Sequence, residues 1–341
     1  MTVQATNNDS LLVWGAGAMG GTIGATLTRA GHPVRFVDCA EDHVRTMRTR
    51  GLQVRGPIAD FTVEADAATP LELEGRYSRV LLCVKAHHTR DAIDQLESFL
   101  SDDGYVVSIQ NGLNERVIAD RIGAQRTIGA FVNFGADYIE PGVVHWGGRG
   151  AVVLGELDGV RTDRLSHLHT MLRDFEPAAV VTSNIFGFLW SKLAYAALLF
   201  ATALTDESIV DVLEAVCYRS LLVRIARETC RVAELNGVEL ESFDGFDPRA
   251  FGGGGDDDAA VRSLLDLVAF NRRSAKTHSG IWRDLAVRKR KTEVDAQLLP
   301  VVETGRRLGV PTPLTERIIN QIHEIESGAR LMTWDNLEEL L

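Results

Sequence analysis

The chain has 341 residues, of which 45% are hydrophobic and 24% are charged, as is typical of a soluble globular protein long enough for two domains. Its formal net charge of −11 argues against nucleic acid or another polyanion as the main partner. The four cysteines form no CxxC pair and no Cys/His ligand spacing, which indicates reduced thiols and no metal site. The polar N-terminus has no apolar signal-peptide core, so we expect a cytoplasmic protein.

The first predicted element is a strand over residues 11–14, which runs into a glycine-rich turn and then a helix over residues 18–30. Three glycines at the GxGxxG spacing form this turn: Gly15, Gly17 and Gly20. The first makes a tight turn, the second gives a pyrophosphate access to the backbone, and the third lets the helix approach the sheet. The first helical N–H groups, from Ala18 and Met19, then face the phosphates at the positive end of the helix dipole. The turn therefore predicts a dinucleotide-binding site.

Asp38 ends the next predicted strand, residues 34–37, at about the 20-residue spacing from the glycines that such sites use. A carboxylate at this position accepts hydrogen bonds from the adenosine ribose. It also repels the extra phosphate of NADP, so it favours NAD. The alternative is an ordinary surface aspartate at a strand end.

Strands and helices continue to alternate through the first half of the chain. Further strands are predicted over residues 53–55, 61–64, 80–84 and 105–109, and helices over residues 42–50, 89–100 and 114–122. Three short strands with glycine-rich turns are expected to extend the sheet in a mixed or antiparallel manner: residues 128–134, 142–146 and 151–154. A helix over residues 162–175 and a strand over 179–182 follow. This alternation predicts an α/β fold with a parallel sheet covered on both faces.

The second half of the chain is almost wholly helical in pattern. Helices are predicted over residues 185–204, 208–236, 261–271, 292–308 and 314–327, with a solvated loop over 251–258. We expect a Rossmann-type dinucleotide-binding domain over residues 1–183 and an all-helical domain over 184–341. The apolar segment 188–204 is short for a membrane span and contains a lysine, so it is interpreted as a buried helix.

Three polar residues are candidates for chemistry. Lys85 and Asn111 follow predicted strands at the edge where ligands gather in a parallel sheet, although a solvated lysine and an Asn-Gly turn are the alternatives. Lys192 lies in an otherwise apolar helix, where burial of an ammonium is costly and favours release of its proton near neutral pH. The alternative for Lys192 is a lysine that reaches water near the first turn of the helix.

Six short motifs occur in the order found in a known family. They are GAGAMGG at residues 15–21, VKA at 84–86, QNG at 110–112, PGVVHWGG at 141–148, WSKLAYA at 190–196 and TEVD at 292–295. On these motifs the chain resembles the ketopantoate reductases over about residues 11–326. The resemblance implies a Rossmann domain followed by a helical domain.

The resemblance also implies roles for the matching residues. Lys192 corresponds to the general acid that protonates the carbonyl oxygen of the substrate during hydride transfer. Asn111 corresponds to an asparagine near nicotinamide and substrate, and Glu293 to a carboxylate that closes the site and helps hold the lysine. Lys85 matches a lysine of the same site, where it contacts cofactor and substrate.

The chain departs from the family at its substrate positions. The residues four and eight positions after the family's lysine are Ala196 and Phe200 instead of asparagines, which leaves an apolar wall on that helix face. The substrate-binding serine of the family falls on Gly280, with Ser279 one position earlier, when Asp284 is taken as the aspartate that follows it. One extra residue also separates this aspartate from the motif TEVD.

We therefore expect an NAD-dependent oxidoreductase that acts on a small 2-oxo acid, or its 2-hydroxy counterpart, with a more apolar or bulkier tail than ketopantoate. NADP is the less favoured cofactor, because Cys39 stands where the family has a basic residue for the 2′-phosphate. Three alternatives stay open: an NADPH-dependent 2-dehydropantoate 2-reductase, a catabolic NAD-dependent hydroxy-acid dehydrogenase, and a nucleotide-binding sensor without turnover. The helical domain is a candidate surface for a homodimer, and no membrane partner is expected.

Overall fold

The computed structural model describes residues 10–273 and 277–341, and the chain divides into two compact units, Met1–Ile185 and Phe186–Leu341. The first unit is a mixed α/β domain and the second is helical, which confirms the predicted fold class. The observed division lies near the start of helix α6 (Ile185–Thr202), whereas the sequence places the boundary between residues 183 and 184. The first nine residues, on which the expectation of no signal peptide mainly rests, lie outside the described part of the chain.

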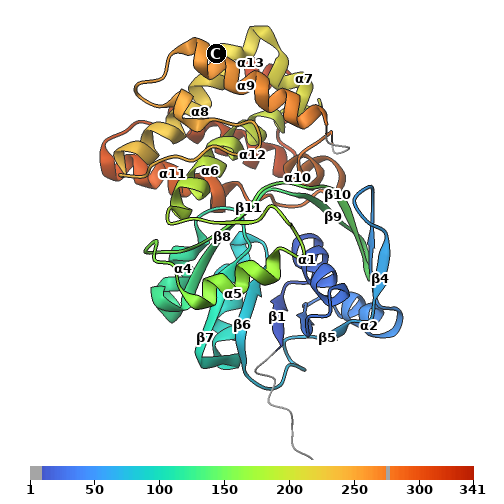
Figure 1. The fold of residues 1–341 in the computed structure, drawn as a ribbon. Helices are drawn as coiled ribbons and strands as arrows, with labels where there is room; N and C mark the ends of the chain where they lie inside the picture. Colours follow the sequence, from blue (N-terminus) through green and yellow to red (C-terminus); the bar gives the residue numbers. More distant parts are fainter. Residues whose placement is uncertain (1–9, 274–276) are drawn as a thin grey trace, which may run out of the picture. The chain divides into compact units, whose positions relative to one another are not determined.

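An eight-stranded sheet forms the centre of the first unit, in the order β12-β11-β8-β7-β6-β1-β2-β5 (Figure 1). Its strands are β1 (Leu11–Trp14), β2 (Val34–Val37), β5 (Asp66–Ala68), β6 (Tyr77–Leu82), β7 (Leu100–Ser108), β8 (Thr127–Val132), β11 (Val152–Glu156) and β12 (Val180–Val181). All neighbours from β5 to β8 pair in parallel, and β11 pairs antiparallel with β8. The sheet is thus parallel at its centre, and β8 and β11 extend it in the mixed manner that the sequence predicts.

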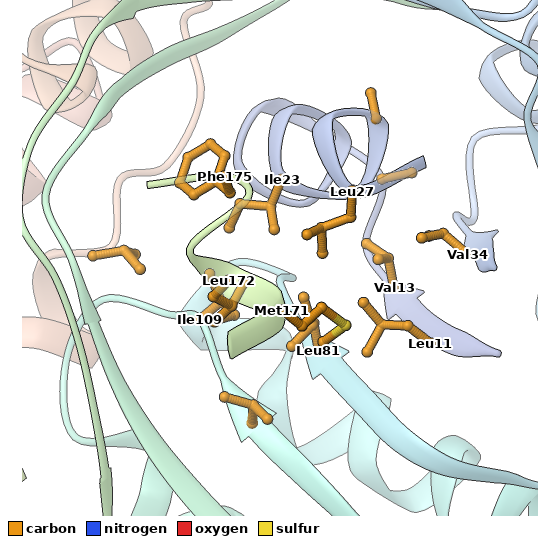
Figure 2. Close-up of a cluster of buried hydrophobic side chains, with 14 of the residues drawn as sticks. Leu11, Val13, Ile23, Leu27, Val34, Leu81, Ile109, Met171, Leu172 and Phe175 are labelled. Carbon is orange, nitrogen blue, oxygen red and sulfur yellow. The ribbon is translucent and has the colours of Figure 1, made fainter. Parts of the chain in front are cut away.

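Side chains alternate between the two faces of this sheet, as the twofold period of a strand requires. Leu11 and Val13 of β1 join one buried cluster, and Leu12 and Trp14 join the other. Helices α1 (Ala18–Arg29) and α5 (Asp163–Leu172) contribute to the first cluster, which Figure 2 shows over β1. Helices α3 (Thr89–Leu96) and α4 (Asn114–Ile122) contribute to the second cluster. Burial on both faces explains why these strands read as continuous apolar runs.

A second sheet of four strands lies against α1, in the order β4-β3-β10-β9. Its strands are β3 (Leu52–Arg55), β4 (Phe61–Val63), β9 (Gly135–Glu140) and β10 (Val143–Gly148), and helix α2 (Glu41–Arg50) precedes β3. The expectation that residues 142–146 extend the main sheet is therefore wrong. Val144 packs on α1 instead, close enough that a Cβ on Gly21 would stand 3.1 Å from its Cγ1. Helix α1 is consequently covered by a sheet on each side, which explains its run of buried residues from Gly20 to Leu27.

The second unit is built from helices. They are α6, α7 (Ile209–Glu214), α8 (Arg219–Leu235), α9 (Asp257–Arg272), α10 (Gly280–Trp282), α11 (Val294–Leu308), α12 (Pro313–Glu326) and α13 (Asp335–Glu338). The single helix predicted over residues 208–236 is wrong, because the chain is extended at Ala215 (ψ 109°) and makes a 3-10 turn before α8. The sequence has no glycine or proline at this break. The helical spacing of apolar residues continues across it, which is why one helix was predicted.

Helix α6 is long and apolar enough to cross a membrane by composition alone, but 78% of it is buried inside the structure. A core helix of a water-soluble domain has the same properties, because its apolar residues face other helices on all sides. This burial agrees with its interpretation as a buried helix.

Candidate functional site

The glycine-rich turn has the backbone that a dinucleotide loop requires. Gly15 has a φ of +98°, which favours glycine, and a Cβ there would stand 2.9 Å from the backbone nitrogen of Val84. A Cβ on Gly20 would collide with the carbonyl oxygen of Gly15. A Cβ on Gly17, in contrast, would meet nothing within 4 Å. Gly17 therefore borders open space, and the absence of its side chain leaves room for a pyrophosphate.

The N-terminus of α1 adds positive charge beside this space. Gly17 is the N-cap of α1 and supplies no side-chain cap, and the first turn of the helix contains no acidic residue. The backbone N–H of Gly21 donates to the carbonyl oxygen of Gly17 at 2.7 Å, so the helical hydrogen bonds begin there. The preceding N–H groups, those of Ala18 and Met19 among them, form the uncapped end to which anions bind.

Asp38 holds the turn in place. Its Oδ2 accepts the backbone N–H of Ala16 at 2.9 Å, and its Oδ1 accepts the backbone N–H of Ala40 at 3.0 Å. Each carboxylate oxygen has a further lone pair, so these bonds leave acceptor capacity for ribose hydroxyls.

The surroundings of Asp38 are acidic. Burial, with the nearby carboxylates of Asp38, Asp42 and Glu140, raises the pKa of the Tyr138 phenol. Burial and then the charge of Asp38 raise the pKa of the Cys39 thiol.

Lys85 and Asn111 lie at the same edge of the sheet as the glycine turn. Strand β6 lies between β1 and β7, with Leu82 opposite Trp14 on one side and opposite Ser108 on the other. Lys85 follows β6 and begins a short 3-10 turn, and Asn111 follows β7. Both side chains are half-buried. The structure therefore brings these two residues together with the glycine-rich turn.

A buried polar network joins the ends of β6 and β7, and sequence reasoning missed it. The Gln110 side-chain amide donates to the carbonyl oxygen of Val84 at 2.9 Å and to Thr89 Oγ1 at 2.8 Å. Thr89 Oγ1 lies 2.9 Å from Asn114 Oδ1, and the Asn114 amide donates to the carbonyl oxygen of Asn111 at 2.6 Å. The only signal in the sequence was Gln110 itself, as the first residue of the motif QNG. The network fixes the two loops that carry Lys85 and Asn111.

In the second unit, Lys192 is half-buried on α6. Ala196 is 6% exposed and Phe200 is fully buried, so the face that follows Lys192 is apolar and closely packed. Phe200 therefore belongs to the packed core of the second unit.

The segment from Ser279 to Glu293 contains an unusual helical turn. Ser279 caps α10 by accepting the backbone N–H of Trp282 at 3.1 Å, while Gly280 is exposed. Residues Arg283–Val287 form a π-helical turn, in which the N–H of Arg288 donates to the carbonyl oxygen of Arg283 at 2.8 Å. A π-turn accommodates one more residue than an α-turn and is frequent at functional sites. The turn lies within the stretch from Asp284 to Glu293, in which the sequence has one extra residue.

Asp284 is buried in this segment and anchors it. Its Oδ1 accepts Arg290 Nε at 2.9 Å and Arg288 Nη1 at 3.3 Å. Arg283 is adjacent, and its pKa is lowered by burial and then by the charge of Arg288. Glu293 is half-buried at the N-cap of α11. Charged groups are thus concentrated around the π-turn.

Comparisons with known proteins agree with this arrangement. The family model described as "Ketopantoate reductase PanE/ApbA" matches residues 11–159, and its C-terminal counterpart matches residues 184–326. A 2-dehydropantoate 2-reductase of Pyrococcus horikoshii is 27% identical, over 89% of this chain and 93% of its own length. A second such enzyme, of Mesorhizobium japonicum, is 26% identical over 92% of this chain and 97% of its own length.

Solved structures show the same fold. A D-mandelate dehydrogenase in a ternary structure with NADH and anilino(oxo)acetate has a TM-score of 0.81 at 20% identity, covering 94% of this chain and 98% of that one. A 2-dehydropantoate 2-reductase of Geobacter metallireducens has a TM-score of 0.80 at 25% identity, covering 92% of this chain and 99% of that one. With both halves matched by the family models, the chain belongs to the ketopantoate reductase family, and it is a nicotinamide-dependent oxidoreductase that acts on a C=O or CH–OH group.

Proposed function

We propose that the protein is an NAD-dependent reductase of a 2-oxo acid, or a dehydrogenase of the corresponding 2-hydroxy acid. The loop of Gly15, Gly17 and Gly20 binds the pyrophosphate, and Asp38 accepts hydrogen bonds from the adenosine ribose. The bound nicotinamide supplies or accepts the hydride at the carbonyl carbon. Lys85 and Asn111 lie at the strand ends beside this loop, where they orient cofactor and substrate.

The preference for NAD over NADP rests on the charges near Asp38. Asp38 lies at the end of β2, and Asp38, Asp42 and Glu140 all act on the phenol of Tyr138, although Asp42 also forms an ion pair with Arg45. Cys39 supplies no positive charge to a 2′-phosphate. A phosphate dianion placed there would lose its hydration and gain no cationic partner from Asp38 or Cys39. The structurally similar D-mandelate dehydrogenase is described with NADH.

Lys192 acts as the general acid in this proposal. As the hydride reaches the carbonyl carbon, negative charge develops on the carbonyl oxygen, and the ammonium of Lys192 stabilises it and transfers a proton. Glu293 orients this ammonium and favours its charged form through its own negative charge. Asn111 fixes the substrate by a hydrogen bond from its amide.

The apolar face of α6 selects the substrate. Ala196 offers no hydrogen bond to a hydroxylated tail, and Phe200 is fully buried in the core, so a polar tail would be desolvated on this face without compensation. An aliphatic or aromatic tail makes no hydrogen bonds to water, so it loses none when it packs on this face. Ser279 and Gly280 lie at the start of α10, where exposed Gly280 leaves space for a bulky group. The D-mandelate dehydrogenase neighbour is described with an aromatic oxo acid, anilino(oxo)acetate.

A spectrophotometric assay tests the proposal. Reduction of aliphatic and aromatic 2-oxo acids, including ketopantoate, is measured with NADH and with NADPH at 340 nm. We expect kcat/KM to be at least about tenfold higher with NADH, and higher for oxo acids with apolar tails than for ketopantoate. A tenfold preference for NADPH contradicts the assignment of Asp38.

A second function has one observation in its favour: the curated relatives are 2-dehydropantoate 2-reductases. A higher kcat/KM for ketopantoate with NADPH than for every other pair would establish it.

We further propose a cytoplasmic homodimer with no membrane partner. The burial of α6 supports an aqueous environment, and a structurally similar ketopantoate reductase of Staphylococcus aureus is described as dimeric. Light scattering after size-exclusion chromatography measures the mass of the assembly directly.

A further inference from the structure

His43 forms two buried hydrogen bonds that the proposed chemistry does not use. It lies on α2 and is 1% exposed. Its Nδ1 is 2.9 Å from the backbone nitrogen of Gly142, and its Nε2 is 2.9 Å from the carbonyl oxygen of Ala16. The Gly142 N–H can only donate, so Nδ1 is the acceptor. The ring is therefore the neutral tautomer with hydrogen on Nε2, which donates to Ala16.

The bond to Ala16 fixes the phosphate loop from behind. Ala16 lies between Gly15 and Gly17, and its N–H already donates to Asp38 at 2.9 Å. Both polar backbone groups of Ala16 are thus held by side chains from other segments. A carbonyl oxygen turned towards a pyrophosphate would repel it, and His43 holds this oxygen on the side of α2.

The bond to Gly142 gives a role to the motif PGVVHWGG. Gly142 has a φ of +77°, and a Cβ there would stand 2.5 Å from Thr46 Cγ2, so the turn between β9 and β10 requires glycine. Its carbonyl oxygen accepts the N–H of Gln53 at 2.8 Å. Tyr138 of β9 meets the imidazole edge-to-face, with ring centroids 5.1 Å apart. The second sheet thereby holds His43 in a single orientation.

We propose that His43 is a positioning residue for the dinucleotide: its Nε2–H donor holds the carbonyl oxygen of Ala16 and so sets the conformation of the phosphate loop, while Gly142 and Tyr138 support the ring. This inference rests on the proposed binding of NAD at that loop. A loop that is already in its binding conformation loses less conformational entropy when it binds the ligand. Losing the Nε2 donor therefore weakens NADH binding, while the chemical step at saturating NADH is unaffected.

Two substitutions separate the two hydrogen bonds. In His43→Gln, the side-chain amide nitrogen replaces Nε2 and keeps the donor to Ala16. In His43→Asn, the side-chain oxygen replaces Nδ1 and keeps the acceptor for Gly142, but the donor to Ala16 is lost. The dissociation constant of NADH is measured by fluorescence titration, with KM for NADH and kcat as second readouts.

We expect His43→Asn to raise the Kd and KM for NADH about tenfold and His43→Gln to raise them less than about threefold, with little change in kcat. His169 of α5 is the matched control, because its Nε2 makes the same kind of bond to the carbonyl oxygen of Ala179 at 2.8 Å. His169→Asn and His169→Gln should leave the Kd unchanged.

Two results overturn the inference alone. One is an equal Kd for NADH in the two His43 variants, and the other is a His43→Asn variant that binds NADH as tightly as the wild-type protein. Thermal unfolding without ligand shows whether each variant is folded. If the wild-type protein does not bind NADH, both the inference and the proposed function are overturned. This result differs from the two above, in which the wild-type protein still binds NADH and only the inference fails.

Discussion

At the scale of single residues, Lys192 is the group on which the proposed chemistry depends. Changing Lys192 to alanine removes the proton donor and the positive charge beside the developing alkoxide, so we expect kcat to fall by about 10²- to 10⁴-fold. KM for NADH should change little, because the phosphate loop belongs to the other unit. Lys291 is exposed, and Lys291→Ala is the control for a general loss of charge. A loss below about tenfold in Lys192→Ala, measured under steady-state conditions, contradicts the assignment.

Also at the scale of single residues, alkylation of Cys39 tests the proposed position of the adenosine ribose. Cys39 and Cys217 both reach the surface, but partial burial and then the charge of Asp38 raise the pKa of the Cys39 thiol, so less of Cys39 is thiolate at pH 8 than of an ordinary cysteine. We expect iodoacetamide to modify Cys217 before Cys39, as measured by mass spectrometry of the digested protein. NADH at ten times its Kd leaves about a tenth of the sites empty and should slow modification of Cys39 about tenfold. Cys217 is the internal control, and equal protection of both thiols would contradict the placement of the ribose at Asp38.

At the scale of elements, the network of Gln110, Thr89 and Asn114 connects the loops after β6 and β7. Gln110→Leu keeps a similar volume but leaves the carbonyl oxygen of Val84 and Thr89 Oγ1 without this donor. We expect the free energy of unfolding to fall by about 1–3 kcal/mol and kcat/KM to fall with it. Gln95 is exposed on α3, and Gln95→Leu should have almost no effect on either quantity. Urea denaturation and steady-state kinetics check this, and an unchanged stability would show that the network has no energetic role.

The elements also show how far sequence reasoning reaches. The central strands of the first unit and helix α6 were predictable, because burial on several sides leaves uninterrupted apolar runs. The second sheet was not, since its strands are short and pair over long distances, as β3 does with β10. The glycine loop, Lys85 and Asn111 follow from local motifs. The partners of His43 do not, because Gly142 lies 99 residues away and no local pattern encodes that contact.

At the scale of the whole molecule, the two units have separate compact folds, and the proposed cofactor loop lies in the first. A ligand that binds only the folded state stabilises it by about 2.7 kcal/mol at one hundred times its Kd. Thermal unfolding followed by scanning calorimetry should therefore show a transition that rises with NADH concentration. NADPH at the same concentrations should shift this transition less, because its 2′-phosphate would meet the negative charge of Asp38 at the proposed ribose site. Asp38→Asn removes this charge, so it should bring the NADPH shift closer to the NADH shift. If NADPH gives the larger shift in the unmodified protein, the negative charge at the end of β2 does not exclude the phosphate, and the preference for NAD is wrong.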